Sequence, residues 1–172
     1  MHSLRRLCLT TCALSLGIAG GVRADAAALQ AFADHCFSPY LTAETAQDAL
    51  SSEGVRIDFY DTRPFSSAEP SPPAGRPATP GTDRRCEVAF DGTATDAGIA
   101  AVASGLSREG ITAETDVPAG FPALDTSAFV AARLLNPRRI AVVQVGTRPG
   151  PHGTETYLNV ERLDPLPNGV RP

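Results

Sequence analysis

His152 has the clearest setting for acid–base chemistry in this sequence. It lies in 147–155, a glycine- and proline-rich segment, with Arg148 four residues before it and Glu155 three residues after it. Loops held by rigid strands often carry functional side chains, so His152 with Glu155 or Asp61 is a candidate general acid or base. The alternative is an exposed histidine in a hairpin loop, where small polar residues are common. We favour that alternative.

The other motifs predict neither a metal nor a cofactor. Asp34, His35 and Cys36 are consecutive near the end of a predicted helix, so their side chains cannot all point toward one zinc ion. Asp58 and Asp61 are three residues apart on a predicted strand and face opposite sides of a sheet, which argues against a shared carboxylate pair. The chain also lacks a Gly-x-Ser-x-Gly motif and the glycine spacing of a phosphate-binding loop.

A set of arginines is the one constellation that fits a binding function. If the strands on either side of Asn136-Pro137 form a hairpin, Arg133 and Arg138 come close together. Guanidinium groups recognise carboxylates and phosphates through paired hydrogen bonds, so a basic patch on an acidic protein is a candidate anion site. The alternative, which we favour, is that these arginines solubilise a sheet face and pair with Glu155 or Glu161. The candidate binding residues are Arg133, Arg138, Arg139, Arg148 and His152.

Residues 1–24 have the pattern of a secretory signal peptide. Arg5 and Arg6 form a charged start, Leu7–Ala19 is apolar, and Val22-Arg23-Ala24 offers small residues near a cleavage site. The apolar run is too short to cross a bilayer, which takes roughly 20 residues, so we expect no integral membrane segment after cleavage. The alternative is a retained membrane anchor. We therefore expect a periplasmic or secreted protein.

The charge balance argues against nucleic acid as a partner. The chain carries a formal net charge of −4, and loss of the three arginines in residues 1–24 would take it to −7. An acidic surface is repelled by phosphate backbones, and no basic cluster offsets that repulsion. The remaining residues, 25–172, suit one globular domain with a substantial core. No feature of the sequence indicates an oligomeric state.

Two cysteines, Cys36 and Cys86, remain once Cys8 and Cys12 leave with the signal segment. An oxidising compartment favours a disulfide between them. Both fall on apolar faces, Cys36 on a predicted helix and Cys86 on a predicted strand, so the bond would join helix to sheet. It would stabilise the fold by about 4 kcal/mol in the chain-entropy model. Two buried free thiols are the alternative.

The segment 62–83 contains six of the chain's 15 prolines and almost no apolar side chain to bury. This composition is typical of a mobile loop, and we expect one here. The alternative is a polyproline ligand for the groove of a partner protein. The segment 126–135 fits a short helix or a strand. We choose the strand, because the apolar run after Asn136-Pro137 needs a partner.

Periodicity predicts an α+β fold: a mainly antiparallel sheet of five to six strands, about three helices packed on one face, and one long proline-rich loop. The expected helices are 26–36, 42–52 and one between 93 and 110. The expected strands are 55–61, 84–90, 111–117, 127–135, 140–146 and one around 158–161, with a loop at 147–154 and a frayed tail from 164.

These observations favour a non-enzymatic domain that binds a protein or a small anionic partner through the sheet face or the loops near Arg138 and His152. The alternative is a small periplasmic hydrolase or isomerase that uses His152 with a nearby carboxylate.

Overall fold

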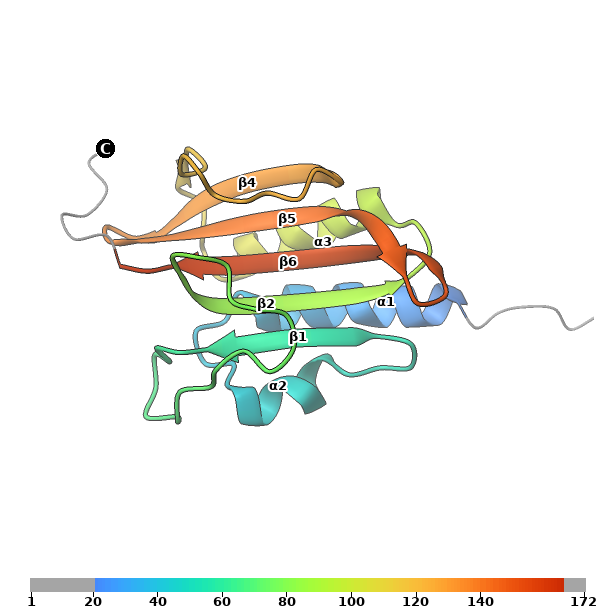
Figure 1. Cartoon of the computed structure of the whole chain (residues 1–172), viewed down its shortest axis with the longest axis horizontal. Coiled ribbons are helices and arrows are strands. Elements are labelled where there is room, and N and C mark those ends of the chain that lie inside the picture. The colour runs from blue at the N-terminus through green and yellow to red at the C-terminus, as the bar shows by residue number, and fades with distance from the viewer. Residues whose placement is uncertain (1–20, 166–172) are drawn as a thin grey trace, which may run out of the picture.

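The computed structural model describes residues 21–165, with side chains from residue 25 onward. These residues form one six-stranded antiparallel sheet in the order β1-β2-β6-β5-β4-β3. The helices lie on one face of it, and the other face, which we call the open face, carries no helix and is crossed only by loops (Figure 1). The helices are α1 (Gly21–Ala31), continued by the π-helical turn η1 (Phe32–Cys36), α2 (Ala43–Leu50) and α3 (Thr95–Arg108). The strands are β1 (Arg56–Asp61), β2 (Thr82–Asp91), β3 (Glu114–Thr115), β4 (Ser127–Asn136), β5 (Arg139–Gly150) and β6 (Gly153–Leu163). The predicted α+β class is confirmed.

The main core lies between the sheet and the helices. Alternating residues of β2, such as Cys86, Val88 and Phe90, point toward the helices and are fully buried. Leu158 of β6 and Val143 of β5 continue the same apolar layer. This is the face that period-2 alternation predicts, because successive side chains of a strand point to opposite sides.

The predicted disulfide is confirmed. Cys36 at the end of η1 is bonded to Cys86 of β2, and their Cα atoms are 5.5 Å apart. The bond attaches the N-terminal helical segment to a central strand, since β2 has β1 on one side and β6 on the other. The tight packing of this region depends on Gly105 of α3, where an added Cβ would lie 2.4 Å from the Phe37 ring.

Several predicted boundaries need correction. The segment 126–135 is a strand, as chosen, but the strand expected at 111–117 is reduced to the two residues of β3. The loop expected at 147–154 is wrong: β5 and β6 continue through it to a turn at Pro151-His152. Proline has no backbone N–H to donate to a neighbouring strand. Pro149 is tolerated in β5 because β4 pairs with β5 only as far as Gly146, so no residue of β4 lies beside Pro149.

The proline-rich segment crosses the open face of the sheet in front of β1 and β2 (Figure 1). Its residues 62–81 contain no regular strand, its last two residues begin β2, and a single bridge joins Ser71 to Asp61 at the end of β1. The loop is therefore placed against the sheet, and its mobility stays a prediction.

Two other predictions fall largely outside the described residues: most of the signal segment, up to residue 20, and the tail from residue 166. No helix within 21–165 has the length and apolar character that crossing a membrane requires.

Candidate functional site

His152 lies at the exposed tip of the β5–β6 hairpin. The two carboxylates expected beside it, Glu155 and Asp61, are either paired with arginines or distant. Glu155 accepts hydrogen bonds from Arg148 at 2.6 Å and from Arg56 at 2.9 Å, and Asp61 lies at the other end of the sheet. Among residues 21–165 no hydrogen bond joins His152 to an acidic side chain, and His152 lines neither of the two pockets described below. The geometry gives the hydrolase hypothesis no support, and that hypothesis stays untested.

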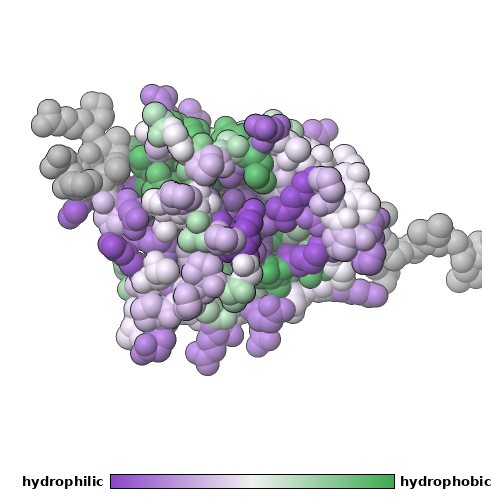
Figure 2. Space-filling view, in the orientation of Figure 1, coloured by the Kyte–Doolittle hydropathy of each residue, from purple (hydrophilic) through white to green (hydrophobic). Residues whose placement is uncertain are grey.

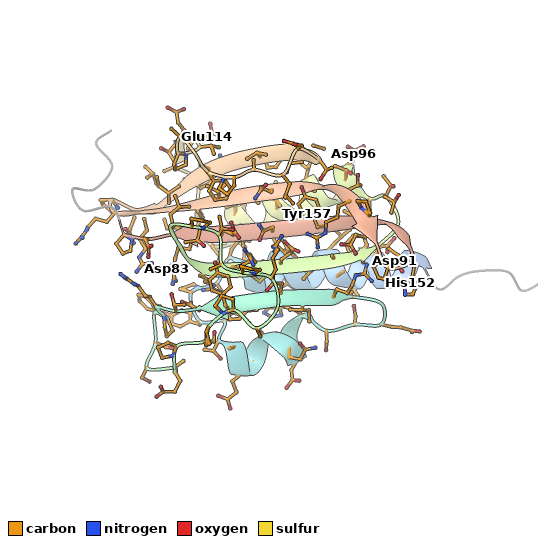
Figure 3. All side chains as sticks on the ribbon, viewed as in Figure 1. Asp83, Asp91, Asp96, Glu114, His152 and Tyr157 are labelled. Carbon is orange, nitrogen blue, oxygen red and sulfur yellow. A yellow bond between two sulfur atoms is a disulfide. The ribbon has the colours of Figure 1, made fainter. Side chains whose placement is uncertain are left out.

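The five predicted binding residues do not form one patch. Arg133 of β4 pairs with Glu114 of β3 at 3.0 Å. Arg138 lies in the turn before β5 and Arg139 is the first residue of β5, whereas Arg148 is nine residues beyond Arg139, or roughly 30 Å away at strand spacing. Figure 3 shows the same separation: Asp83 and His152 lie toward opposite ends of the sheet. Asp83 marks the end where Arg139 lies, because the two residues form an ion pair.

The open face carries a continuous chain of ion pairs, which we call the open-face network. Carboxylates and arginines alternate along it, and each arginine contacts two carboxylates. Hydrophilic surface accordingly gathers over the middle of this face (Figure 2). In order, the members are Glu161, Arg85, Asp58, Arg76, Glu87, Arg148, Glu155, Arg56 and Asp91.

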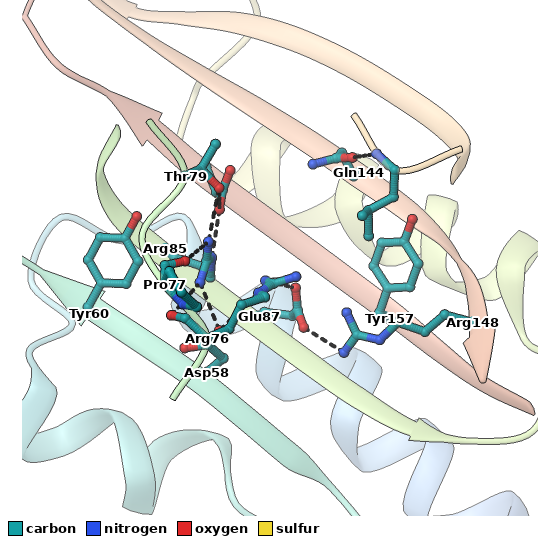
Figure 4. A network of polar contacts seen from close by, with 12 residues as sticks. Asp58, Tyr60, Arg76, Pro77, Thr79, Arg85, Glu87, Gln144, Arg148 and Tyr157 are labelled. Carbon is teal, nitrogen blue, oxygen red and sulfur yellow. Dashed lines mark hydrogen bonds and ion pairs between the residues drawn. The ribbon is translucent and has the colours of Figure 1, made fainter. Parts of the chain in front are cut away.

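Arg85 joins the open-face network to the proline-rich loop (Figure 4). Its guanidinium donates to Glu161 at 2.6 Å, to the Pro77 carbonyl at 3.0 Å and to the Thr79 hydroxyl at 2.9 Å. Burial by itself lowers the pKa of Arg85, but the contacts with Glu161 and Asp58 outweigh it and the pKa is raised. Every part of this buried cation therefore has a partner within the chain.

A second polar cluster lies on the helix side, at the end of the sheet where β1 ends and β2 begins. It borders a cavity of about 490 Å³, which we call the arginine pocket. Four arginines from separate segments line this cavity, together with one carboxylate, Glu109. The arginines are Arg63, Arg84, Arg139 and Arg162.

Three of these arginines share only two buried aspartates. Arg162 donates to Asp83 at 2.6 Å and to Asp61 at 2.7 Å, and Arg139 also donates to Asp83. Arg84 is left with Asp61 at 3.7 Å, beyond hydrogen-bond distance, and one oxygen of Asp61 accepts no hydrogen bond. This group therefore has one more cation than anion.

Arg84 is the least compensated of the three arginines that share the two aspartates. Its side chain is only 6% exposed, and it makes one hydrogen bond, to the Ser38 carbonyl at 2.8 Å, while its guanidinium lies over the ring of Phe59. Burial, and secondarily the charge of Arg162, lowers the pKa of Arg84 to about 10, against the opposing effect of Asp61. Arg84 thus remains a cation at neutral pH with unused hydrogen-bond donors.

Most of the other residues that line the arginine pocket are apolar. Phe37, Leu135 and Val160 are among its lining residues, and Phe65 also lines it. Phe65 stacks edge-to-face on Tyr40 with ring centroids 5.6 Å apart, and the two rings are 69% and 68% exposed. Cationic and apolar groups thus line one cavity, an arrangement suited to a molecule with one anionic end.

Sequence reasoning placed only Arg139 of this pocket among the candidates. Arg84 and Arg85 are adjacent in the sequence, but successive strand residues point to opposite faces, so Arg84 lines the arginine pocket and Arg85 belongs to the open-face network. The sequence feature that could have indicated these clusters is the number of charged residues in β2 and β6. Charged side chains on central strands are buried, and a buried charge needs a partner.

Comparisons with family models, with curated proteins and with solved structures find no match to this chain. Within residues 21–165 there is also no group of three or more His, Cys, Asp or Glu side chains placed to hold a metal ion. The arguments for function therefore come from the two clusters themselves.

Proposed function

We propose that this protein is a non-enzymatic binding domain that holds a small organic anion in the arginine pocket. The anionic group lies against Arg84 and Arg139, and an apolar part of the ligand lies against Phe37, Leu135 and Val160. The observation that carries the proposal is the incompletely compensated guanidinium of Arg84 beside a cavity of about 490 Å³.

Electrostatics supports an anion rather than a cation. A carboxylate that reaches Arg84 supplies the charge-assisted hydrogen bonds that Asp61, at 3.7 Å, does not make. Arg139 lies nearer the solvent, with its side chain 21% exposed, so it can meet an incoming anion before Arg84 does. Both cations act in surroundings of low dielectric, where a charge pair is stronger than in water.

The apolar lining supports an organic ligand rather than a bare inorganic ion. Ligand cavities of 300–1,000 Å³ combine apolar walls with polar groups that fix orientation, and this cavity places Phe37, Leu135 and Val160 beside its charged side chains. The exposed rings of Tyr40 and Phe65 at its border offer further apolar contact. We also propose that the domain works outside the cytoplasm, as the disulfide and the signal-like residues 1–24 support.

The test is to titrate the protein with straight-chain monocarboxylates, from butyrate to decanoate, and to measure binding by isothermal titration calorimetry. Inorganic phosphate is the comparison ligand, because it is an anion without an apolar part. We expect affinity to rise with chain length and then level off as the cavity fills. Arg139→Gln should weaken binding at least tenfold, about 1.4 kcal/mol, through loss of a charge-assisted contact.

The matched control is Arg138→Gln, which removes the neighbouring exposed arginine outside the pocket lining. It should bind as the parent protein does. Binding of phosphate alone, absence of binding by every carboxylate, or equal weakening in both variants would each reject the proposal.

A further inference from the structure

The outer edge of β1 presents backbone groups that have no partner. Antiparallel strands alternate between residues bonded to the neighbour and residues whose N–H and C=O point away from it. Thr62 N–H donates to Asp83 of β2, whereas Asp61 exchanges hydrogen bonds with Ser71 on the outer side. By this alternation, Ile57 and Phe59 also direct their backbone groups outward.

These outward groups are free over a short central stretch of the edge. Val55 N–H donates to the Ser52 carbonyl at one end, and Ser71 covers Asp61 at the other. Within the described residues, no loop or helix bonds the N–H or C=O of Ile57 and Phe59, and the strand alternation directs these groups away from β2, so we infer that they have no partner. Both ends of the edge are thus closed, and the middle is left open.

A groove runs along this open stretch. Its volume is about 440 Å³, and we call it the β1 groove. Its helix-side wall includes Ala43 and Ala46 of α2, and Ala74 and Gly75 of the proline-rich loop lie on its other wall. Such small side chains leave room for a main chain beside β1.

We propose that the β1 groove binds an extended segment of a partner polypeptide, which adds to the sheet as a strand beside β1. Strand addition satisfies exposed edge groups with main-chain hydrogen bonds and takes specificity from alternate side chains. The free groups of Ile57 and Phe59 are two residues apart, about 7 Å, so they engage a segment of roughly three to five residues.

The charges along the groove select the chemistry of that segment. Arg76 is 37% exposed, whereas the carboxylates with which it pairs, Asp58 and Glu87, are 20% and 4% exposed. Arg148, which also lines the groove, is 26% exposed, whereas its two carboxylate partners, Glu87 and Glu155, are 4% and 5% exposed. Guanidinium groups therefore face the solvent, and an acidic side chain of the partner that points toward the open face is favoured.

A second copy of this chain fits the edge poorly. In a two-fold pairing that matches Ile57 with Phe59, Val55 would fall opposite Asp61, whose outward groups already bond Ser71. Such a contact could extend over very few residues, which leaves little surface for a stable dimer. A separate flexible segment has no such restriction.

The experiment pans a library of displayed unconstrained heptapeptides against the purified protein, followed by synthesis of the enriched peptides. We expect these peptides to contain an acidic residue within an alternating extended pattern. Amide exchange measured by NMR should slow at least tenfold at Ile57 and Phe59 on binding, while the amides of Asp58 and Tyr60, which face β2, should change little.

Gly75→Trp fills the groove without strain, since no heavy atom lies within 4 Å of an added Cβ, and Ala43→Trp does so from the exposed N-terminal turn of α2. Each should reduce peptide affinity at least tenfold with an unchanged melting temperature. The control is Ala78→Trp, an exposed position on the same loop outside the groove lining.

Failure to enrich any peptide, protection that maps away from Ile57 and Phe59, or equal binding by Gly75→Trp would overturn the proposal. Concentration-dependent dimerisation that protects the same two amides would overturn the choice of occupant, because the edge would then bind a second copy.

Discussion

The two polar clusters differ in how completely their charges are compensated. In the open-face network each of four arginines contacts two carboxylates, and the proline-rich loop supplies further acceptors. In the arginine pocket, Arg84, Arg139 and Arg162 share two aspartates, and one aspartate oxygen has no hydrogen bond. Both clusters border a cavity, but only the arginine pocket contains a buried cation without a hydrogen-bonded carboxylate.

This difference separates a structural role from a binding role. A buried ion pair costs desolvation energy that only complete pairing offsets, so a fully paired network mainly holds its own elements together. A cation with unused donors beside a cavity retains the capacity to bind an anion from outside. The following variants test this division.

The largest effect is expected from Arg85→Met in the open-face network. Removal of this guanidinium leaves Glu161 buried with fewer partners and frees the loop carbonyl of Pro77, which should cost about 3–5 kcal/mol of unfolding free energy. Urea denaturation followed by circular dichroism measures it. The double variant Arg85→Met, Glu161→Leu should recover most of the loss. A cost below about 1 kcal/mol for the single variant would contradict the structural role.

Replacement of both cysteines by alanine should cost about 2–4 kcal/mol, because the bond between Cys36 and Cys86 closes a long loop of chain. Cys36 also lines the arginine pocket, so carboxylate affinity should fall in the same variant. Unfolding and calorimetry on one preparation measure both effects. Full affinity in the variant would show that the pocket is formed without the bond.

Thr79→Val should release the proline-rich loop at a cost of about 1–2 kcal/mol. The hydroxyl accepts from Arg85 and donates to Glu161, and valine can do neither. Limited proteolysis should then cut within 62–81 faster than in the parent protein. Ser67→Ala, an exposed position on the same loop, is the control. Equal cutting of all three proteins would indicate that the loop is already mobile, as its composition predicts.

Arg84→Met should change the unfolding free energy by only about 1 kcal/mol or less, in contrast to Arg85→Met. Asp61 keeps its bond to Arg162, and a methionine can fill the space beside Phe59. Carboxylate binding should nevertheless be lost. A loss of stability as large as that of Arg85→Met would show that Arg84 is fully engaged in the fold and would remove the distinction between the clusters.

Sequence periodicity predicts the layers of this fold well. The alternation of Cys86, Val88 and Phe90 identifies the face of β2 that meets the helices, and helical spacing places Cys36 toward the same core. The hairpin at Asn136-Pro137 follows from turn chemistry. These features are local, because each depends on residues a few positions apart.

The arginine pocket could not be predicted in this way. Its arginines come from the loop after β1, from β2, from β5 and from β6, and no spacing within the sequence brings them together. The strand register decides which of Arg84 and Arg85 faces the helices. Polar residues expected to face solvent, such as Glu161, are buried because a loop predicted to be mobile lies over them.

The smallest effect is expected from His152→Ala, although this residue was the leading catalytic candidate in the sequence. His152 is exposed at the β5–β6 turn, and its replacement should shift the melting temperature by less than about 2 °C. It lies at the opposite end of the sheet from the arginine pocket, so carboxylate affinity should also be unchanged. A tenfold loss of affinity in His152→Ala would place the anion at the hairpin instead, beside Arg148. That result would contradict the division between a fully paired open-face network and an arginine pocket with an incompletely paired cation.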